Sequence, residues 1–546
     1  MQATMKQLPA YGAAWWPLRR WRRRGALFLP RPFPGRSGGR GFGARSRILL
    51  CLLPVAALFS LAAPTRAQAN VPTRGSVAAA LRSRDYALAL TLSQELARAH
   101  PTDPETWTLE GVALEGLGRE KESLQAFDHA LQVDPNNVTA LEAAAQLEFQ
   151  AGSPKAVPFL EKLLRLNPHD QAAHAMMAAL AFKRKDCTTT VAHYQEISQV
   201  VANTVPALLQ FGACLFHLGR YADALSVFQR IAELRPQDPE ALYNLGLAQH
   251  GAHHYADAIH TLLPLTEAGP ESQRVGALNL IAAVYEADQQ TPQAVAALEK
   301  AIALAPGDID NYLDLATISL DHGSYQVGVD VVNAGLHVLP DSAPLYLERG
   351  VLEAQMEDRY DQANADFRRA EALNPLQNYS TVALAISLLQ ENKLDESVQV
   401  VKQRLAKAPD DPILNYLLAE LLIRKGVQPG MPSFQEAEAA AQRAVRSKPD
   451  FTLAEDDLTE LYLRSGQTAL AEATSRLALK SDPNDPSALY YLIVCLRKKG
   501  DRAELPHLVQ KLAEVTATLQ EQEGALNRFK LVEEQGGRNL QKKAIP

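Results

Sequence analysis

The sequence predicts an all-α solenoid built from stacked helix pairs. Three observations point to it: a proline recurs about every 34 residues, small residues recur at fixed places within each period, and a glycine often stands midway between prolines. The chain is also too long, at 546 residues, for one ordinary hydrophobic core. Alanine and leucine dominate a hydrophobic content of 47%, and both residues favour helix.

The recurring prolines define the length of the repeat. They are Pro101, Pro135, Pro168, Pro236, Pro270, Pro306, Pro340, Pro375, Pro409, Pro449 and Pro483. Most gaps between them are 33–36 residues. The 68-residue gap after Pro168 contains two periods, with Ala202 in the place of proline, and the 40-residue gap before Pro449 contains the extra loop VQPGMP. Because proline lacks an N–H and clashes with the preceding turn, each one is expected to end a helix.

Each period divides into two predicted helices. Apolar residues at i, i+3, i+4 and i+7 indicate one amphipathic helix on each side of a central glycine, such as Gly118 or Gly219. A small residue in the first half, such as Gly212, and another twelve residues later, such as Ala224, would let the two helices approach closely. A single pair cannot bury its apolar face, so neighbouring pairs must stack.

The clearest unit is ALYNLGLAQHGAHHYADAIHTLL, residues 241–263. Its small residues, central turn and aromatic residue, and those of QFGACLFHLGRYADALSVFQRIAELRP, resemble the tetratricopeptide repeat family. The resemblance covers about residues 72–515 and implies a right-handed superhelical solenoid of about thirteen antiparallel helix pairs. We expect the repeat domain to span residues 70–515, with a polar capping helix and tail over residues 516–546. The fold alone does not define a function.

Residues 1–69 differ in character from the rest of the chain. They carry one lysine and eleven arginines without Asp or Glu, a formal charge of +12, whereas the remainder carries −19. Arg45 and Arg47 precede an apolar run of 16 residues, and the AQA sequence at residues 67–69 follows it as a cleavage pattern. We therefore expect a signal peptide cleaved after Ala69, with retention of the leader as a membrane anchor as the alternative. Either outcome indicates export to the periplasm or cell envelope of a bacterium.

The composition and motifs argue against several classes of function. The acidic charge beyond the leader argues against nucleic-acid binding, which needs a basic surface. Contact with a membrane is expected only through an uncleaved leader. The sequence contains no G-x-S-x-G, H-E-x-x-H or phosphate-cradling G-x-x-x-x-G-K-[ST] motif, and the repeats occupy nearly all of the mature chain. We therefore expect neither enzymatic activity nor a bound cofactor.

Three histidines have a spacing that resembles a metal site on one helix face. His250, His253 and His254 stand at i, i+3 and i+4. His253, however, occupies the place of the central glycine, so a turn is expected to break the helical spacing. No cysteine or carboxylate completes a tetrahedral ligand set nearby. We interpret these residues as exposed turn histidines and predict no metal site.

Three cysteines follow the leader: Cys187, Cys214 and Cys495. No CxxC or CxxCH motif is present, so they are readily explained as small buried hydrophobic residues. Cys187 is expected to begin the second helix of one pair, and Cys214 lies late in the first helix of the next. Antiparallel stacking would bring these ends together, and an exported protein permits a disulfide. The sequence leaves both states open, a bridge or free thiols.

The resemblance implies that the first helix of each pair lines a concave groove. The position one turn after the small residue is occupied by Phe149, Phe182, Phe216 and His250 in four successive units. Such an aromatic ladder would hold apolar side chains of a bound segment. The alternative is that the rings pack between adjacent first helices.

Further groove candidates are polar or aromatic residues of later first helices. They are Tyr243, Asn244, Asp310, Asp314, Tyr416 and Tyr490. A second group of acidic residues, Asp456, Asp457 and Glu460, is interpreted as a solvated face, the usual meaning of a charge cluster.

These observations predict a scaffold or adaptor of the cell envelope that binds a protein or peptide segment in its concave groove. Two alternatives stay open at this point. One is an accessory subunit of a polysaccharide or protein export assembly, and the other is an enzyme with an unrecognised site in the groove.

Overall fold

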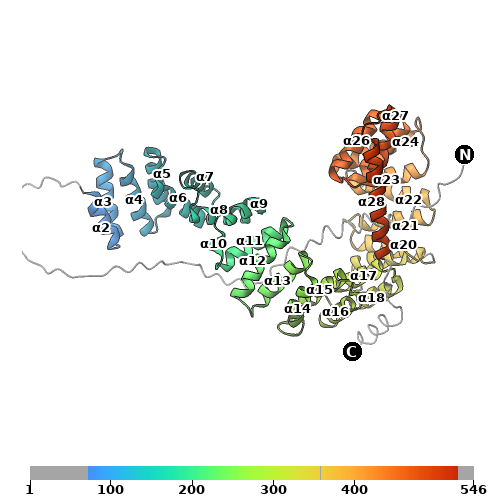
Figure 1. Cartoon of the computed structure of the whole chain (residues 1–546), viewed down its shortest axis with the longest axis horizontal. Coiled ribbons are helices and arrows are strands. Elements are labelled where there is room, and N and C mark those ends of the chain that lie inside the picture. The colour runs from blue at the N-terminus through green and yellow to red at the C-terminus, as the bar shows by residue number, and fades with distance from the viewer. Residues whose placement is uncertain (1–71, 357, 527–546) are drawn as a thin grey trace, which may run out of the picture. The chain divides into compact units, whose positions relative to one another are not determined.

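Helices account for all the regular secondary structure in the part of the chain that the structure describes, residues 72–356 and 358–526 of a computed structural model (Figure 1). The predicted signal peptide and its cleavage pattern lie outside these residues. Within them, no helix is long and apolar enough to cross a membrane. By internal contacts the described chain divides into an N-terminal unit, residues 72–254, and a C-terminal unit, residues 255–526.

The N-terminal unit begins with five helix pairs and the first helix of a sixth. The helices are α2 (Arg74–Arg82), α3 (Tyr86–Ala99), α4 (Pro104–Gly116), α5 (Glu120–Val133), α6 (Val138–Gln150), α7 (Ala156–Leu166), α8 (Gln171–Lys183), α9 (Cys187–Glu196), α10 (Ser198–Val201), α11 (Val205–His217), α12 (Tyr221–Leu234) and α13 (Pro239–Gly251). The fourth pair is irregular, because its second helix is interrupted at Ile197 and continues as the one-turn α10.

The C-terminal unit begins with α14, the second helix of the sixth pair in chain order, and adds seven more pairs. Its helices are α14 (Tyr255–Glu267), α15 (Glu271–Ala287), α16 (Thr291–Leu304), α17 (Ile309–Asp321), α18 (Tyr325–Val338), α19 (Ala343–Glu353), α20 (Tyr360–Leu373), α21 (Tyr379–Gln390), α22 (Leu394–Leu405), α23 (Pro412–Arg424), α24 (Pro432–Ser447), α25 (Thr452–Arg464), α26 (Thr468–Ser481), α27 (Pro486–Lys499) and α28 (Leu505–Leu526). In chain order the described helices make thirteen pairs, which confirms the predicted fold class.

The predicted start and stop signals account for the helix ends. Several first helices begin at an Asp-Pro pair in which the aspartate caps the helix; Asp238, for example, accepts a hydrogen bond from the Glu240 N–H. The central glycines adopt the left-handed conformation that closes the first helix, with φ of 74° at Gly118 and 73° at Gly219. His253 has the same conformation, φ 62°, at the place where the other units have glycine.

Small residues allow the two helices of a pair to approach closely. A methyl group added at Gly212 would lie 2.9 Å from the ring of Phe228. Phe228 belongs to the second helix of the same pair, and its side chain is buried. Where the second small residue carries a hydroxyl, it ties the helices together: Ser123 donates a hydrogen bond of 2.8 Å to the Gly111 carbonyl. The recurrence of small residues in the sequence therefore reflects this close contact.

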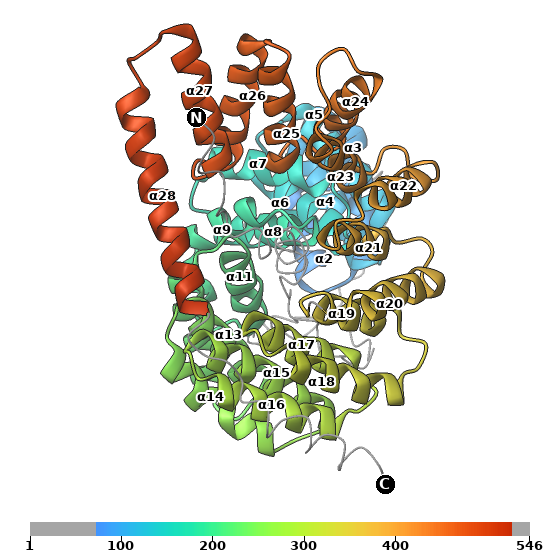
Figure 2. The same cartoon turned by 90° about the vertical axis from the view of Figure 1, so that its right-hand side faces the viewer.

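In the C-terminal unit the first helices line the inner side of the row. Neighbouring first helices pack directly against one another, as α17 does on α19, α23 on α25, and α25 on α27. In the C-terminal unit the second helices α16, α18, α20, α22 and α24 lie on the outer side of the row (Figure 2). Residues on the exposed face of a first helix consequently face the inner side.

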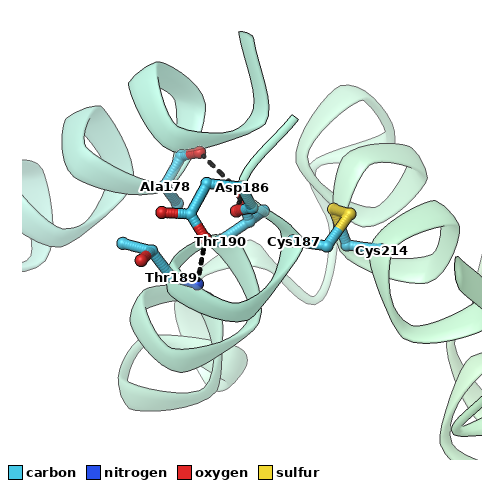
Figure 3. Close-up of a disulfide and its surroundings, with 6 residues drawn as sticks. All are labelled: Ala178, Asp186, Cys187, Thr189, Thr190 and Cys214. Carbon is cyan, nitrogen blue, oxygen red and sulfur yellow. Dashed lines mark hydrogen bonds between the residues drawn. A yellow bond between two sulfur atoms is a disulfide. The ribbon is translucent and has the colours of Figure 1, made fainter. Parts of the chain in front are cut away.

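A disulfide joins the fourth and fifth pairs. Cys187 is the first residue of α9 and Cys214 lies in α11, with their Cα atoms 4.8 Å apart (Figure 3). Asp186 caps α9 beside it by accepting from the Thr189 N–H. The bridge, which the sequence left open, is therefore formed. Cys495 is a buried free thiol, and burial raises its pKa.

The last helix, α28, is the second helix of the thirteenth pair. Its residues Leu505, Leu508, Leu512 and Val515 belong to the apolar cluster that it forms with α27. The helix runs without interruption across the boundary expected between residues 515 and 516, and ends at Leu526. Residues 516–526 thus continue the same helix.

Candidate binding groove

The three phenylalanines of the predicted ladder are half-buried. Phe149 packs against the apolar cluster of the third and fourth pairs, whereas Phe182 and Phe216 pack against that of the fourth and fifth. The Phe216 ring lies 5.1 Å from that of Tyr221, in T-shaped geometry. A methyl group at Gly251, in the next first helix, would lie 3.0 Å from the Phe216 ring. The ring therefore spans the junction between pairs, which favours a packing role.

His250, His253 and His254 lie where α13 ends and the turn to α14 begins. The turn at His253 separates the α13 end from α14. Among the described residues, no group of three or more His, Cys, Asp or Glu side chains has an arrangement suited to a metal ion. His250 is half-buried; burial and then the neighbouring His253 lower its pKa. A shallow hollow of about 420 Å³ beside His253 and His254 is lined also by Arg220, Tyr221 and Asp223.

The next candidates differ in how far they reach the surface. On α13, Tyr243 is half-buried and Asn244 is buried. Burial raises the pKa of the Tyr243 hydroxyl. On α17, Asp310 is half-buried and Asp314, one turn later, is exposed. Asp314 thus offers a carboxylate on a first helix of the C-terminal unit.

The last three first helices bring together a set of side chains that the sequence did not place in one site. We call five of them the α25 carboxyl cluster: Glu420 of α23, Asp456, Asp457 and Glu460 of α25, and Asp485, which caps α27. Tyr416 and Tyr491 flank them. Tyr490, beside Tyr491, is 53% exposed, and the two rings lie 5.6 Å apart.

Arginines neutralise only the edge of the α25 carboxyl cluster. Arg424 pairs with Glu420, and Arg464 pairs with Glu460, each one turn further along the same helix. The Tyr491 hydroxyl donates a hydrogen bond of 2.8 Å to Glu460. No ion pair in the described chain joins a basic side chain to either central aspartate, Asp456 or Asp457.

The two central aspartates are buried and carry raised pKa values. Asp456 and Asp457 are each 7% exposed. Burial, followed by the charge of Asp485, raises the pKa of Asp456 to about 9. Burial and the charge of Glu420 hold the pKa of Asp457 well above its usual range. Asp456 is therefore protonated at neutral pH, and the raised pKa of Asp457 likewise favours its protonated form. In that form Asp456 donates a hydrogen bond to Asp485, and Asp457 donates one to Glu420.

The interpretation of Asp456 and Asp457 as part of a solvated face is wrong. Their side chains are covered where α25 packs between α23 and α27. Counted from the prolines of successive repeats, Asp457 aligns with Leu417 before it and Tyr491 after it, and also with Asp314 in an earlier repeat. Because Asp314 is exposed at this position, the alignment alone does not indicate that Asp457 is buried.

Three sequence profiles of repeat families match the chain. Residues 79–208 match the tetratricopeptide domain described as "Cytochrome c-type biogenesis protein H TPR domain". Residues 215–280 match one general tetratricopeptide repeat family, and residues 347–412 and 382–450 match another. The chain is a tetratricopeptide repeat protein. Its inner row of first helices gives it the architecture of a protein-interaction scaffold.

Individual relatives of this tetratricopeptide protein are distant. It is 26% identical over 397 residues to cellulose synthase operon protein C of Pseudomonas fluorescens, an overlap of 65% of this chain and 30% of that protein. It is 26% identical over 184 residues to the BBSome complex member BBS4 of Bos taurus, 33% of this chain and 35% of that protein. The chain thus spans about a third of the length of these relatives. Among solved structures, yeast Tom70 matches with a TM-score of 0.40 at 16% identity, covering 86% of this chain and 95% of that one.

Proposed function

We propose that this tetratricopeptide protein is a scaffold of the bacterial cell envelope, which binds a segment of a protein partner along its inner face. The observation that carries the proposal is the row of first helices, which present polar and aromatic groups on one side of the stack. Asp314 of α17 and Tyr490 of α27 are exposed on such helices. Rows of this kind suit an extended or helical segment, whose side chains alternate between pockets.

Two independent features support a location outside the cytoplasm. The leader has the charge pattern, apolar run and AQA sequence of an exported protein. The Cys187–Cys214 disulfide is the second, because disulfides persist in oxidising compartments such as the periplasm and are rare in the reducing cytosol. The match to the cytochrome c-type biogenesis repeat domain is in keeping with this location.

A second candidate is an accessory role in a polysaccharide assembly. It is favoured by the similarity to cellulose synthase operon protein C, which extends over 65% of this chain. The two candidates differ in what the inner face contacts, a polypeptide or a glycan. Titration with soluble cello-oligosaccharides would separate them, since a protein-binding face should give no saturable heat.

The test of the main candidate is capture of partners from envelope extract with matched variants. Asp314→Arg reverses a charge on a first helix, whereas Leu263→Arg adds a charge to a residue of the second helix α14 that is 50% exposed. We expect Asp314→Arg to lose partners that both the wild type and Leu263→Arg retain. Loss with Leu263→Arg alone would place the binding surface elsewhere and reject the proposal.

A further inference from the structure

The α25 carboxyl cluster has too many acids and too few bases for a purely structural ion network. Its five carboxyl groups face two arginines, and both arginines pair with its outer members Glu420 and Glu460. The inner members, Asp456 and Asp457, are each 7% exposed. Burying a carboxyl group without a basic partner costs several kcal/mol, so an ordinary core would replace it with an apolar side chain.

Unpartnered oxygen atoms within the cluster point to an absent ligand. Asp456 Oδ1 and Asp457 Oδ2 are both buried, and neither makes a hydrogen bond. Asp485 uses one oxygen, Oδ1, to accept from the Ser487 and Ala488 N–H groups at 2.9 and 3.1 Å, which caps α27. Several acceptor positions are thus held together on three adjacent first helices, and the described chain supplies no donor to the two unpartnered oxygens.

The surroundings are suited to a cationic side chain. Tyr416 and Tyr491 flank the carboxyl groups, and a cation is attracted both to carboxylates and to aromatic rings. The charged and titratable groups around the two aspartates are Tyr416, Glu420 and Arg424 of α23, Glu455, Glu460 and Arg464 of α25, and Asp482, Asp485 and Tyr491 at α27. Acids outnumber bases in this set, so its charge complements that of a base.

We propose that the α25 carboxyl cluster binds the side chain of a lysine or arginine in the partner segment. The inference rests on the proposed function, and it specifies the chemistry of the partner. In the absence of that segment, protons on Asp456 and Asp457 take the place of the cation. When the cation enters, both carboxyl groups ionise and their protons pass to solvent. Because the pKa of Asp456 is raised to about 9, affinity should increase as the pH rises toward that value.

The test uses the full chain and a synthetic decapeptide of alternating lysine and alanine. Calorimetric titrations in phosphate and in Tris at pH 7.5 should give different apparent heats, because the two buffers take up the released protons with different enthalpies. Affinity should also rise between pH 6.5 and pH 8.5. Equal heats in the two buffers, or no binding at millimolar peptide, would overturn the inference without requiring any variant.

Matched variants distinguish peptide binding at this site from non-specific electrostatic attraction to an acidic protein. Asp456→Asn/Asp457→Asn keeps the shape of the protonated aspartates and should bind the peptide at least tenfold more weakly, with no proton release. Glu396→Gln/Asp410→Asn makes the same change from acid to amide at two exposed positions of the same unit and should bind within twofold of the wild type. Equal weakening by the two double variants would contradict the inference. A partner captured through Asp314 but indifferent to Asp456→Asn/Asp457→Asn would retain the scaffold function and reject this site alone.

Discussion

Removing the Cys187–Cys214 disulfide should destabilise the N-terminal unit by a predictable amount. The bridge closes a loop of 27 residues, for which the chain-entropy relation gives about 3.5 kcal/mol at 25 °C. Cys214 is fully buried among Leu208, Phe211 and Leu215, so Cys187→Ser/Cys214→Ser also adds polar atoms to an apolar cluster. We therefore expect the double serine variant to lose more than reduction alone.

A single tryptophan makes this loss measurable. In a chain that begins at Asn70, Trp107 is the one tryptophan, and it lies in α4 of the N-terminal unit. Urea unfolding followed by Trp107 fluorescence should shift to lower urea on reduction, because repeat stability depends on contacts with neighbouring pairs. Thiol counting on the denatured, unreduced chain should find one thiol, Cys495. Three thiols, or a change below about 0.5 kcal/mol on reduction, would refute the reasoning.

The remaining predictions concern packing, pH and export. Phe182→Ala and Phe216→Ala should each lower the free energy of unfolding, measured in urea, by about 3 kcal/mol, because both rings pack at junctions between pairs. Loss of partner binding with unchanged stability would contradict a packing role for these rings. The pKa of Asp456 is about 9 in the folded state, above its ordinary 3.8, so the folded chain binds one more proton than the unfolded chain between these values. The stability of the fold should therefore decrease as the pH rises from about 4 to 9. Asp456→Asn should flatten this pH profile and raise Tm at pH 8. The Nδ1 atoms of His174 and His193 lie 2.9 Å apart, and burial followed by His174 lowers the pKa of His193 below 6.5. The N-terminal unit should therefore lose stability as the pH falls through 6.5. His193→Gln should remove part of this loss, measured by Trp107 fluorescence. N-terminal sequencing of protein from the periplasm should begin at Asn70, and an intact leader on cytoplasmic protein would argue against export.

Local signals account for the part of the fold that sequence reasoning predicted. Asp-Pro starts, left-handed glycines and small residues act within one pair, so their spacing predicts the helix order from α2 to α28. The disulfide stayed undecided, because it depends on how α11 is rotated against α9. That rotation is determined by packing between neighbouring helix pairs, which the sequence of a single repeat does not specify.

The α25 carboxyl cluster was missed for a related reason. Asp456 and Asp457 look like surface residues when α25 is considered alone. Their burial follows from the neighbouring helices α23 and α27, which cover them from both sides. Phe216 recurs at a fixed position of the repeat, which the sequence shows. The proximity of its ring to Gly251 of the next pair depends on how the pairs stack, which the sequence does not show.

The measurement that tests the central claim most directly is site-specific photo-crosslinking in the cells that produce the protein. A benzophenone amino acid would replace Asp314 or Tyr490 on the first helices, and Leu263 or Leu477 on the second helices, all of them exposed. We expect a periplasmic partner to be crosslinked at the first-helix positions and at neither second-helix position. Crosslinks confined to Leu263 and Leu477, or formed only with cytoplasmic proteins, would contradict it.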